Sequence, residues 1–132
     1  MKILIAEDDL ASRRFLSKFL TKFGQCDVTV DGMETVEAFM SAWDEKQPYD
    51  LICLDIMMPK LDGLKVLKVI RDLEIEKKVE SRNKAKIIMM TALNDKENVM
   101  EAFGSGCEAY AAKPIDIQKL TEVLNKFGFK AL

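Results

Sequence analysis

The 132-residue sequence predicts a doubly wound α/β fold, in which five parallel strands form one sheet between two layers of helices. Two observations support this prediction. Apolar runs too short for helices alternate five times with segments in which apolar residues recur every three or four positions. The short runs also carry few charges, as do strands buried on both faces of a parallel sheet.

The expected strands are short apolar runs bounded by charged or turn-forming residues. The first is followed directly by three acids, and the third, Leu51 to Leu54, is wholly apolar. The five expected strands cover residues 2–6, 26–30, 51–54, 86–90 and 108–112.

Each expected strand precedes a segment with the apolar spacing of an amphipathic helix. Asp9 is a suitable N-cap for the first helix, and Gly24 ends its apolar pattern as a C-cap would. The third helix follows Asp62-Gly63, and Gly128 closes the fifth. The expected helices cover residues 10–23, 33–43, 64–73, 95–103 and 117–127. For this alternation we expect the flavodoxin-like strand order 2-1-3-4-5.

Composition limits the class of protein. The length suits a single domain over residues 1–132, with 48% hydrophobic and 32% charged residues. A net charge of −2 disfavours a nucleic-acid surface, which needs clustered Lys and Arg. Because the sequence has neither a signal peptide nor an apolar run of membrane-spanning length, we expect a cytoplasmic protein without membrane insertion.

The sequence contains no histidine, which excludes Ser-His-Asp triads and histidine-containing zinc sites. The three cysteines, Cys26, Cys53 and Cys107, form no Cys-x-x-Cys pair, so we expect buried reduced thiols. Any chemistry must therefore use carboxylates, lysines, hydroxyls and, where one is bound, a hard metal ion.

The segment from Glu74 to Lys84 carries seven charges in eleven residues. A solvated extension of the third helix followed by a loop is the simpler interpretation, because charge runs usually face water. A docking loop for a partner is the alternative.

Polar residues follow four of the expected strands: Glu7, Asp8 and Asp9 the first, Asp55 the third, Thr91 the fourth and Lys113 the fifth. The carboxyl ends of parallel strands form one rim, where ligands bind at the point of strand-order reversal. Each residue alone has a structural explanation, and we expect Asp9 to be only a helix cap. Three carboxylates on one rim, however, repel one another unless a cation neutralises them or protons are taken up. All-oxygen ligands near a phosphate favour Mg²⁺ as that cation. The Thr91 hydroxyl and the Lys113 ammonium suit phosphoryl oxygens.

Four fragments at these strand ends carry a family resemblance. They are Ile5 to Asp9, Asp55 to Pro59 followed by Asp62-Gly63, Met90 to Ala92, and Tyr110 to Pro114. Together and in this order they resemble the receiver domains of two-component response regulators, the CheY-like family. The resemblance covers nearly the whole chain, from residue 2 to about residue 127.

The resemblance implies that Asp55 is the phosphoacceptor and that Lys113 binds the phosphoryl group. Thr91 would be the switch hydroxyl and Tyr110 the aromatic switch residue. The peptide between Lys113 and Pro114 would be cis, as is usual for the family at this position.

The resemblance also implies a Mg²⁺ cofactor. Asp8 and Asp55 would contact the metal, Glu7 would reach it through water, and the backbone carbonyl of Met57 would be a further ligand. Glu7 stands where the family frequently has aspartate.

By the same resemblance, the phosphoryl donor would be a phosphohistidine on a sensor histidine kinase or a histidine phosphotransfer protein. Phosphorylation would switch a surface that binds an unknown downstream protein target. The domain would not be an enzyme, although it would assist its own phosphorylation and dephosphorylation. Since the chain ends soon after the fifth helix, we expect that no output domain follows. The chain would then be either a stand-alone regulator or a piece of a longer protein.

In similar receivers, the side chains two residues after the phosphoacceptor and two after the switch hydroxyl flank the path of the hydrolytic water. Here these residues are Met57 and Leu93. Because neither side chain can orient water by hydrogen bonding, we predict slow self-dephosphorylation.

Three other functions are compatible with parts of the pattern. A flavodoxin-like ligand-binding domain would need a Gly- or Ser/Thr-rich phosphate loop after the first strand, where this chain has three acids. An aspartate-based phosphatase would need its nucleophile after the first strand and a substrate cap. A pseudo-receiver that binds partners without phosphorylation is disfavoured by the presence of Asp55, Thr91 and Lys113.

Overall fold

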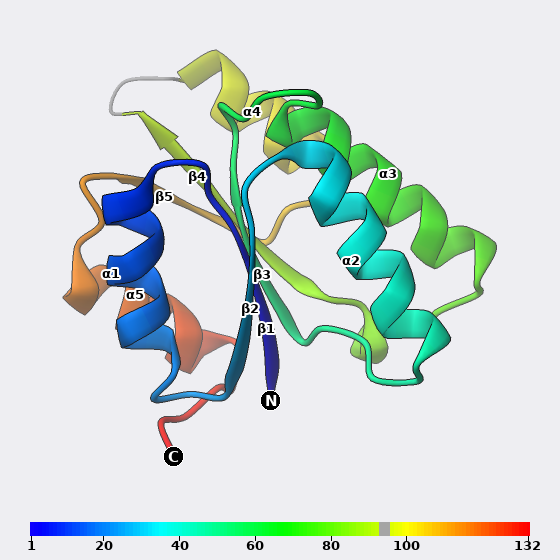
Figure 1. Ribbon diagram of the computed structural model, residues 1–132, viewed down its shortest axis with the longest axis horizontal. Helices are drawn as coiled ribbons and strands as arrows, with labels where there is room; N and C mark the ends of the chain where they lie inside the picture. Colours follow the sequence, from blue (N-terminus) through cyan, green and yellow to red (C-terminus); the bar gives the residue numbers. More distant parts are fainter. Residues whose placement is uncertain (93–95) are drawn as a thin grey trace.

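The computed structural model, which describes residues 1–92 and 96–132, contains the expected five-stranded parallel sheet (Figure 1). The strand order is β2-β1-β3-β4-β5, which confirms the predicted fold class. The strands are β1 (Lys2–Ala6), β2 (Gln25–Thr29), β3 (Leu51–Asp55), β4 (Lys86–Ala92) and β5 (Ala109–Lys113). The helices are α1 (Leu10–Leu20), α2 (Gly32–Asp44), α3 (Gly63–Glu76), α4 (Lys96–Gly104) and α5 (Ile117–Lys126), with a short 3₁₀ turn, η1 (Ser81–Asn83).

Two apolar cores lie on opposite faces of the sheet, and β1 contributes to both. Its residues Ile3 and Ile5 pack with α1 and α5, whereas Leu4 and Ala6 pack with α2, α3 and Ala102 of α4. This alternation follows from the two-residue period of a strand. Figure 1 shows the same division, with α1 and α5 on one side of the sheet and α2, α3 and α4 on the other.

Helix α1 ends earlier than its apolar pattern predicts. The helix stops at Leu20, and Phe23 is buried in the core from the turn that follows. Gly24 is therefore not the C-cap. A Cβ atom on Gly24 would lie 2.2 Å from the Met1 carbonyl oxygen, so glycine is needed there for close backbone packing. Gly128, in contrast, adopts a φ of 86° after α5, as expected of a helix-terminating glycine.

The prediction of a solvated segment from residue 74 onward is wrong at its first residue. Glu74 is completely buried, and its carboxylate is 2.6 Å from Nη1 of Arg71. The other carboxylate oxygen accepts a hydrogen bond from the Ala85 backbone. Ile75 and the charged residues from Glu76 to Arg82 are exposed, in agreement with the prediction, and Lys84 is half-buried. Glu74 departs from the expectation for a charge run because its partner, Arg71, lies outside the run.

The cysteines are free thiols. Burial raises the pKa of Cys53 to about 12 and that of Cys107 to about 11, and it also raises the pKa of the half-buried Cys26. These thiols are therefore protonated near neutral pH. In the described part of the chain, no helix combines the length and the apolar composition that a bilayer crossing requires.

Candidate functional site

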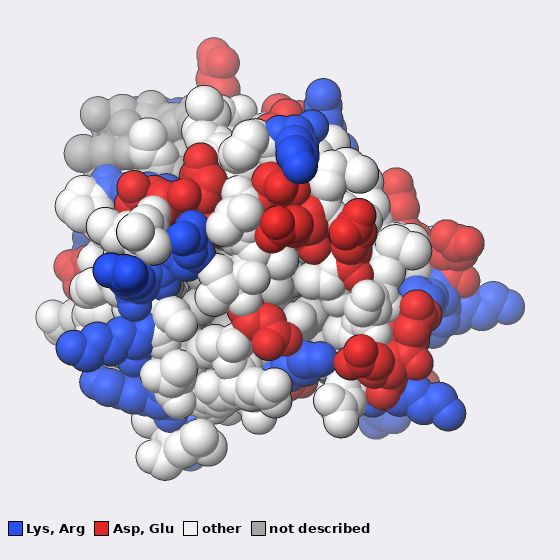
Figure 2. Space-filling view, viewed as in Figure 1, with Lys and Arg blue, Asp and Glu red and all other residues white. Residues whose placement is uncertain are grey.

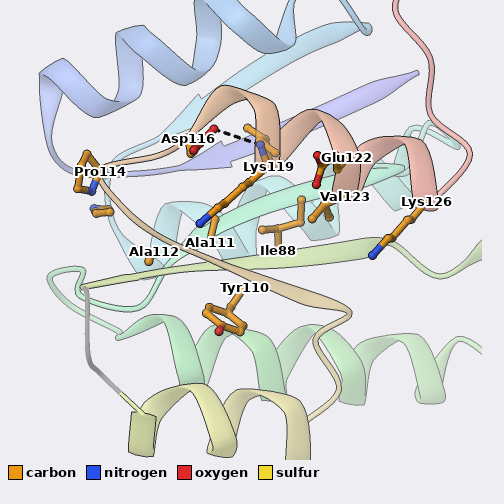
Figure 3. A pocket seen from close by; sticks show the side chains of 12 residues that line it. Ile88, Tyr110, Ala111, Ala112, Pro114, Asp116, Lys119, Glu122, Val123 and Lys126 are labelled. Atoms are coloured by element: carbon orange, nitrogen blue, oxygen red, sulfur yellow. Dashed lines mark hydrogen bonds between the residues drawn. The ribbon is translucent and has the colours of Figure 1, made fainter.

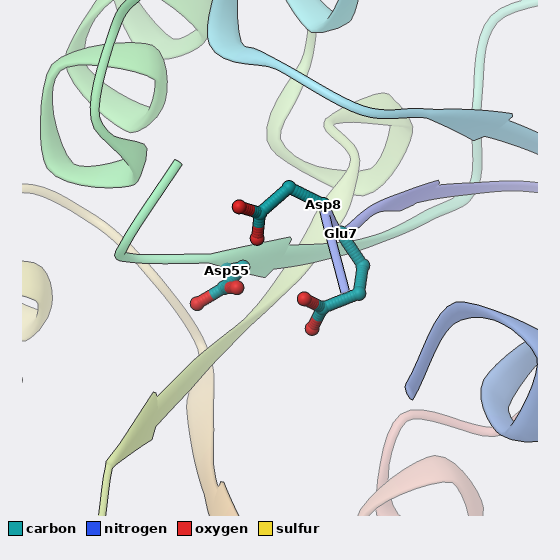
Figure 4. A group of neighbouring side chains, drawn as sticks. All are labelled: Glu7, Asp8 and Asp55. Atoms are coloured by element: carbon teal, nitrogen blue, oxygen red, sulfur yellow. The ribbon is translucent and has the colours of Figure 1, made fainter. Parts of the chain in front are cut away.

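Three carboxylates converge at the carboxyl ends of β1 and β3 (Figure 4). Glu7 and Asp8 directly follow β1, and Asp55 is the last residue of β3. One oxygen from each side chain lies within 4.8 Å of the others. Because β1 and β3 pair in parallel through Ala6 and Leu54, the sheet itself brings these acids together.

Lys113 joins this cluster from the end of β5. Its Nζ lies 2.9 Å from Oδ2 of Asp55 and 2.8 Å from Oε2 of Glu7. Burial acts to lower the pKa of Lys113, but its interactions with the carboxylates of Glu7 and Asp55 raise the pKa above its usual value. Burial raises the pKa of Glu7, and Lys113 opposes that rise. The site therefore places one ammonium among three carboxylates.

The cluster fits a hard divalent cation. Oε1 of Glu7 accepts a hydrogen bond from the Asp9 backbone, whereas the buried Oε2 receives no well-directed hydrogen bond from the described residues despite its closeness to Lys113. Asp8 is exposed, so its side chain can turn toward an ion that still carries water. An all-oxygen set with an open side suits Mg²⁺, which usually retains several waters.

The turn that carries Glu7 and Asp8 is fixed by helix α1. Asp9 is the N-cap of α1, as expected, and accepts a hydrogen bond from the Ser12 amide at 2.9 Å. This bond holds the pKa of Asp9 below its usual value. The guanidinium of Arg13 donates to the carbonyls of Glu7 and Asp8 at 3.1 and 3.3 Å. Arg13 was not among the residues expected at the site, although its position four residues after the cap was a usable signal.

The loop after Asp55 turns back tightly into α3. The Met57 amide donates to Oδ1 of Asp55 at 3.1 Å, and the Met57 side chain is exposed. Asp62 caps α3, and a Cβ atom on Gly63 would lie 2.1 Å from the Asp55 carbonyl oxygen. Only glycine permits this approach, which explains why glycine follows Asp62 at the start of α3.

The two expected switch residues lie on neighbouring strands. Thr91 is buried in β4, one residue beyond Met90, the partner of Asp55 in the sheet. Pairing with β5 continues past Thr91, so Thr91 lies within its strand rather than after it, and Lys113 likewise closes β5. The peptide between Lys113 and Pro114 is cis, as expected. Leu93, the second residue of the dephosphorylation prediction, lies outside the described residues.

Tyr110 does not belong to the acidic cluster. Its ring is about half exposed and packs edge-on against Phe103 of α4, with ring centroids 5.9 Å apart. Figure 3 shows Tyr110 on the α4 side of β5. Tyr110 borders a groove of about 610 Å³ between β5 and α5. An aromatic ring in this position can change orientation without disturbing either core.

Charged side chains are unevenly distributed over the molecule. Figure 2 shows Lys and Arg gathered on the side of α1 and α5, which carry Arg13, Arg14, Lys18, Lys119 and Lys126. Helix α2 carries acids and no Lys or Arg, whereas α3 carries both acids and bases. Arg13, on this basic side, lies next to the acidic cluster, in which Asp8 is exposed.

This combination of a 2-1-3-4-5 sheet and an acidic rim with a lysine is typical of phosphorylatable α/β signalling domains. The chain belongs to the response regulator receiver domain family, whose model matches residues 3–125. Chemotaxis protein CheY of Treponema pallidum is 31% identical over 92% of this chain and 78% of that protein.

Two solved structures are similar over nearly the whole chain. The co-crystal structure of the Saccharomyces cerevisiae phosphotransfer protein Ypd1 with the receiver domain of Ssk1 matches with a TM-score of 0.81 and 29% identity, over 97% of this chain and 88% of that one. The CheX–CheY–BeF₃–Mg²⁺ complex from Borrelia burgdorferi also has a TM-score of 0.81, with 27% identity over 96% of this chain and 89% of that one.

Other relatives that the chain matches are much longer proteins, of which the chain spans only a small part. Hybrid signal transduction histidine kinase G of Dictyostelium discoideum is 33% identical over 97% of this chain, which spans only 4% of that protein.

Proposed function

We propose that residues 1–132 form a single receiver domain that accepts a phosphoryl group on Asp55 with Mg²⁺ and thereby switches a protein-binding surface. The observation that carries this proposal is the position of Lys113, whose ammonium is within 3 Å of both Asp55 and Glu7. A lysine held there is ready to bind an oxygen of a phosphoryl group on Asp55.

The acids and Met57 would hold the metal. Asp8, Asp55 and the Met57 carbonyl would be direct ligands, and Glu7 would act through water. When bound, Mg²⁺ would neutralise charge on the transferring oxygens.

The other residues position the reacting groups. A carboxylate oxygen of Asp55 attacks phosphorus, the phosphorus–nitrogen bond of the donor breaks, and the imidazole departs with the electron pair of that bond. Lys113 binds one phosphoryl oxygen, and the Thr91 hydroxyl donates to another. Movement of Thr91 toward the phosphoryl group frees space for Tyr110 to turn inward. The chain thus assists its own phosphorylation and dephosphorylation without acting on a separate substrate.

The donor would be a sensor histidine kinase or a histidine phosphotransfer protein. The chain has no histidine, so a phosphohistidine must come from a partner. An apolar hollow of about 380 Å³ lies beside Lys113 and is bordered by Phe15 of α1 and Ile115. Phe15 is exposed, so a partner helix could cover it while its histidine reaches Asp55. The co-crystal structure of the phosphotransfer protein Ypd1 with a similar receiver domain supports a histidine phosphotransfer protein as the partner.

The proposal predicts phosphorylation that depends on a divalent metal. Wild-type protein incubated with acetyl phosphate is expected to gain the mass of one phosphoryl group in Mg²⁺ and none in EDTA. Hydroxylamine should remove the group, because an acyl phosphate is sensitive to this nucleophile. Intact-protein mass spectrometry measures both results. No gain of mass in Mg²⁺ would favour the pseudo-receiver, which binds partners without phosphorylation.

The phosphorylated protein is expected to lose its phosphoryl group slowly. Met57 is exposed beside Asp55, and its thioether cannot orient an attacking water. Met57→Asn should accelerate the loss, because an amide can hydrogen-bond that water, whereas Met57→Leu should leave the rate unchanged. Phosphate release after removal of the donor measures these rates. Equal rates for the asparagine and leucine variants would contradict the explanation.

A further inference from the structure

The loop that follows Asp55 is anchored by a neighbouring helix outside the acidic cluster. The Gly32 amide, at the start of α2, donates a hydrogen bond to the Pro59 carbonyl at 3.2 Å. Nζ of Lys60, in the same loop, lies 3.5 Å from Oδ2 of Asp31, the N-cap of α2. Asp31 is buried, and its carboxylate accepts a part-buried hydrogen bond from the Glu34 amide. The position of Asp31 is therefore fixed by α2.

The backbone contact at Gly32 is too close for any side chain. A Cβ atom there would lie 1.9 Å from the Leu61 carbonyl oxygen and 2.6 Å from the Leu61 Cβ. The φ of Gly32 is not in the left-handed region, so the requirement for glycine comes from this contact and not from backbone conformation. A methyl group at Gly32 must therefore push the 59–61 turn away from α2.

A displaced turn would move Met57, because the loop is restrained on both sides of this residue. Before Met57, the Ile56 amide donates to the Met90 carbonyl at 3.0 Å, and the Ile56 carbonyl accepts from Gly63 at 2.8 Å. After Met57, the turn at Lys60 is tight, with a φ of 69°. Met57 thus lies between an anchor on the sheet and an anchor on α2.

We propose that Gly32, assisted by the Asp31–Lys60 ion pair, is a positioning residue that sets the location of the Met57 carbonyl and thereby the preference of the site for Mg²⁺. This inference rests on the proposed function, in which the Met57 carbonyl and the acidic cluster hold the metal. Mg²⁺ requires near-ideal octahedral geometry, whereas Ca²⁺ tolerates irregular ligand sets. A shift of one carbonyl should therefore weaken Mg²⁺ binding much more than Ca²⁺ binding.

The test is calorimetric titration of wild-type protein and Gly32→Ala with Mg²⁺ and, separately, with Ca²⁺. Gly32→Ala should weaken Mg²⁺ binding by about tenfold, the usual effect of losing a group that supports a metal ligand, with a smaller change for Ca²⁺. Gly104→Ala is the matched control, because nothing lies within 4 Å of a Cβ at that position in α4. Urea denaturation in EDTA measures the stability of each variant separately from its metal binding.

Lys60→Met provides a second test that does not depend on tolerating a clash, because Lys60 is exposed. Removal of a positive charge near the site would by itself tighten cation binding, so weaker Mg²⁺ binding by this variant would report lost positioning. Equal loss of both metals in Gly32→Ala, or unchanged Mg²⁺ binding in both variants, would overturn the inference. Absence of Mg²⁺ binding by the wild-type protein would instead overturn the proposed function.

Discussion

Asp55→Asn is expected to abolish phosphorylation by acetyl phosphate completely, while the protein remains folded. The amide of asparagine is a poor nucleophile, and Glu7, the other buried acid beside Lys113, is proposed to act on the metal rather than to accept the phosphoryl group. The same substitution removes one carboxylate from the candidate metal cluster. Mg²⁺ is therefore expected to raise the melting temperature of the wild-type protein but not that of Asp55→Asn.

Asp62→Asn is the matched control for this experiment. Asp62 lies seven residues further along the same loop and only caps α3, by accepting a hydrogen bond from the Lys65 amide. Asparagine caps helices about as well as aspartate, so stability and phosphorylation should both be retained. Mass spectrometry reports phosphorylation, and thermal melting with and without Mg²⁺ reports the metal. A phosphoryl group that persists in Asp55→Asn would place the acceptor elsewhere.

Arg71→Met is expected to lower the free energy of unfolding by about 3 to 5 kcal/mol, because it leaves a buried carboxylate without its partner. Arg71 is largely buried and lies 2.6 Å from Glu74 and 2.7 Å from Glu108. It also donates to the carbonyls of Ala85 and Gly106, each at 2.9 Å. The guanidinium thus ties α3 to the segments that lead into β4 and β5.

Lys68→Met tests whether the burial of the ion pair causes the large loss of stability expected for Arg71→Met. Lys68 lies one turn earlier in α3 and pairs with Glu101 at 3.1 Å, but about half of each side chain is exposed. The loss of this pair should cost less than about 1 kcal/mol. Urea denaturation measures both values. If burial of the Glu74 charge is the cause, Arg71→Met combined with Glu74→Met should be more stable than Arg71→Met alone, and equal costs for Arg71→Met and Lys68→Met would contradict the argument.

The strand and helix positions were predictable because they depend on neighbours along the chain. Apolar periodicity and the caps Asp9 and Asp62 are local signals, and the structure places these elements within a few residues of their expected positions. Gly24 was misassigned because its role depends on contact with Met1, which no local pattern reveals.

The acidic cluster was predictable for a related reason. Once strands are parallel and their order is known, the residues that end them must share a rim, so Glu7, Asp8, Asp55 and Lys113 could be grouped before any distance was known. The resemblance to receiver domains then supplied a role for each residue. It could not supply the contacts that hold the rim in place, such as those of Arg13.

The sequence by itself therefore determined the fold class, the strand order and the membership of the acidic cluster, since all three follow from local patterns and sheet topology. Only the tertiary structure decided that Glu74 is buried against Arg71 and that Gly32 leaves room for the loop after Asp55. The physical reason is that burial and close backbone contact depend on which distant segments meet. A charge or a glycine has the same appearance in a sequence whether it faces water or another part of the chain.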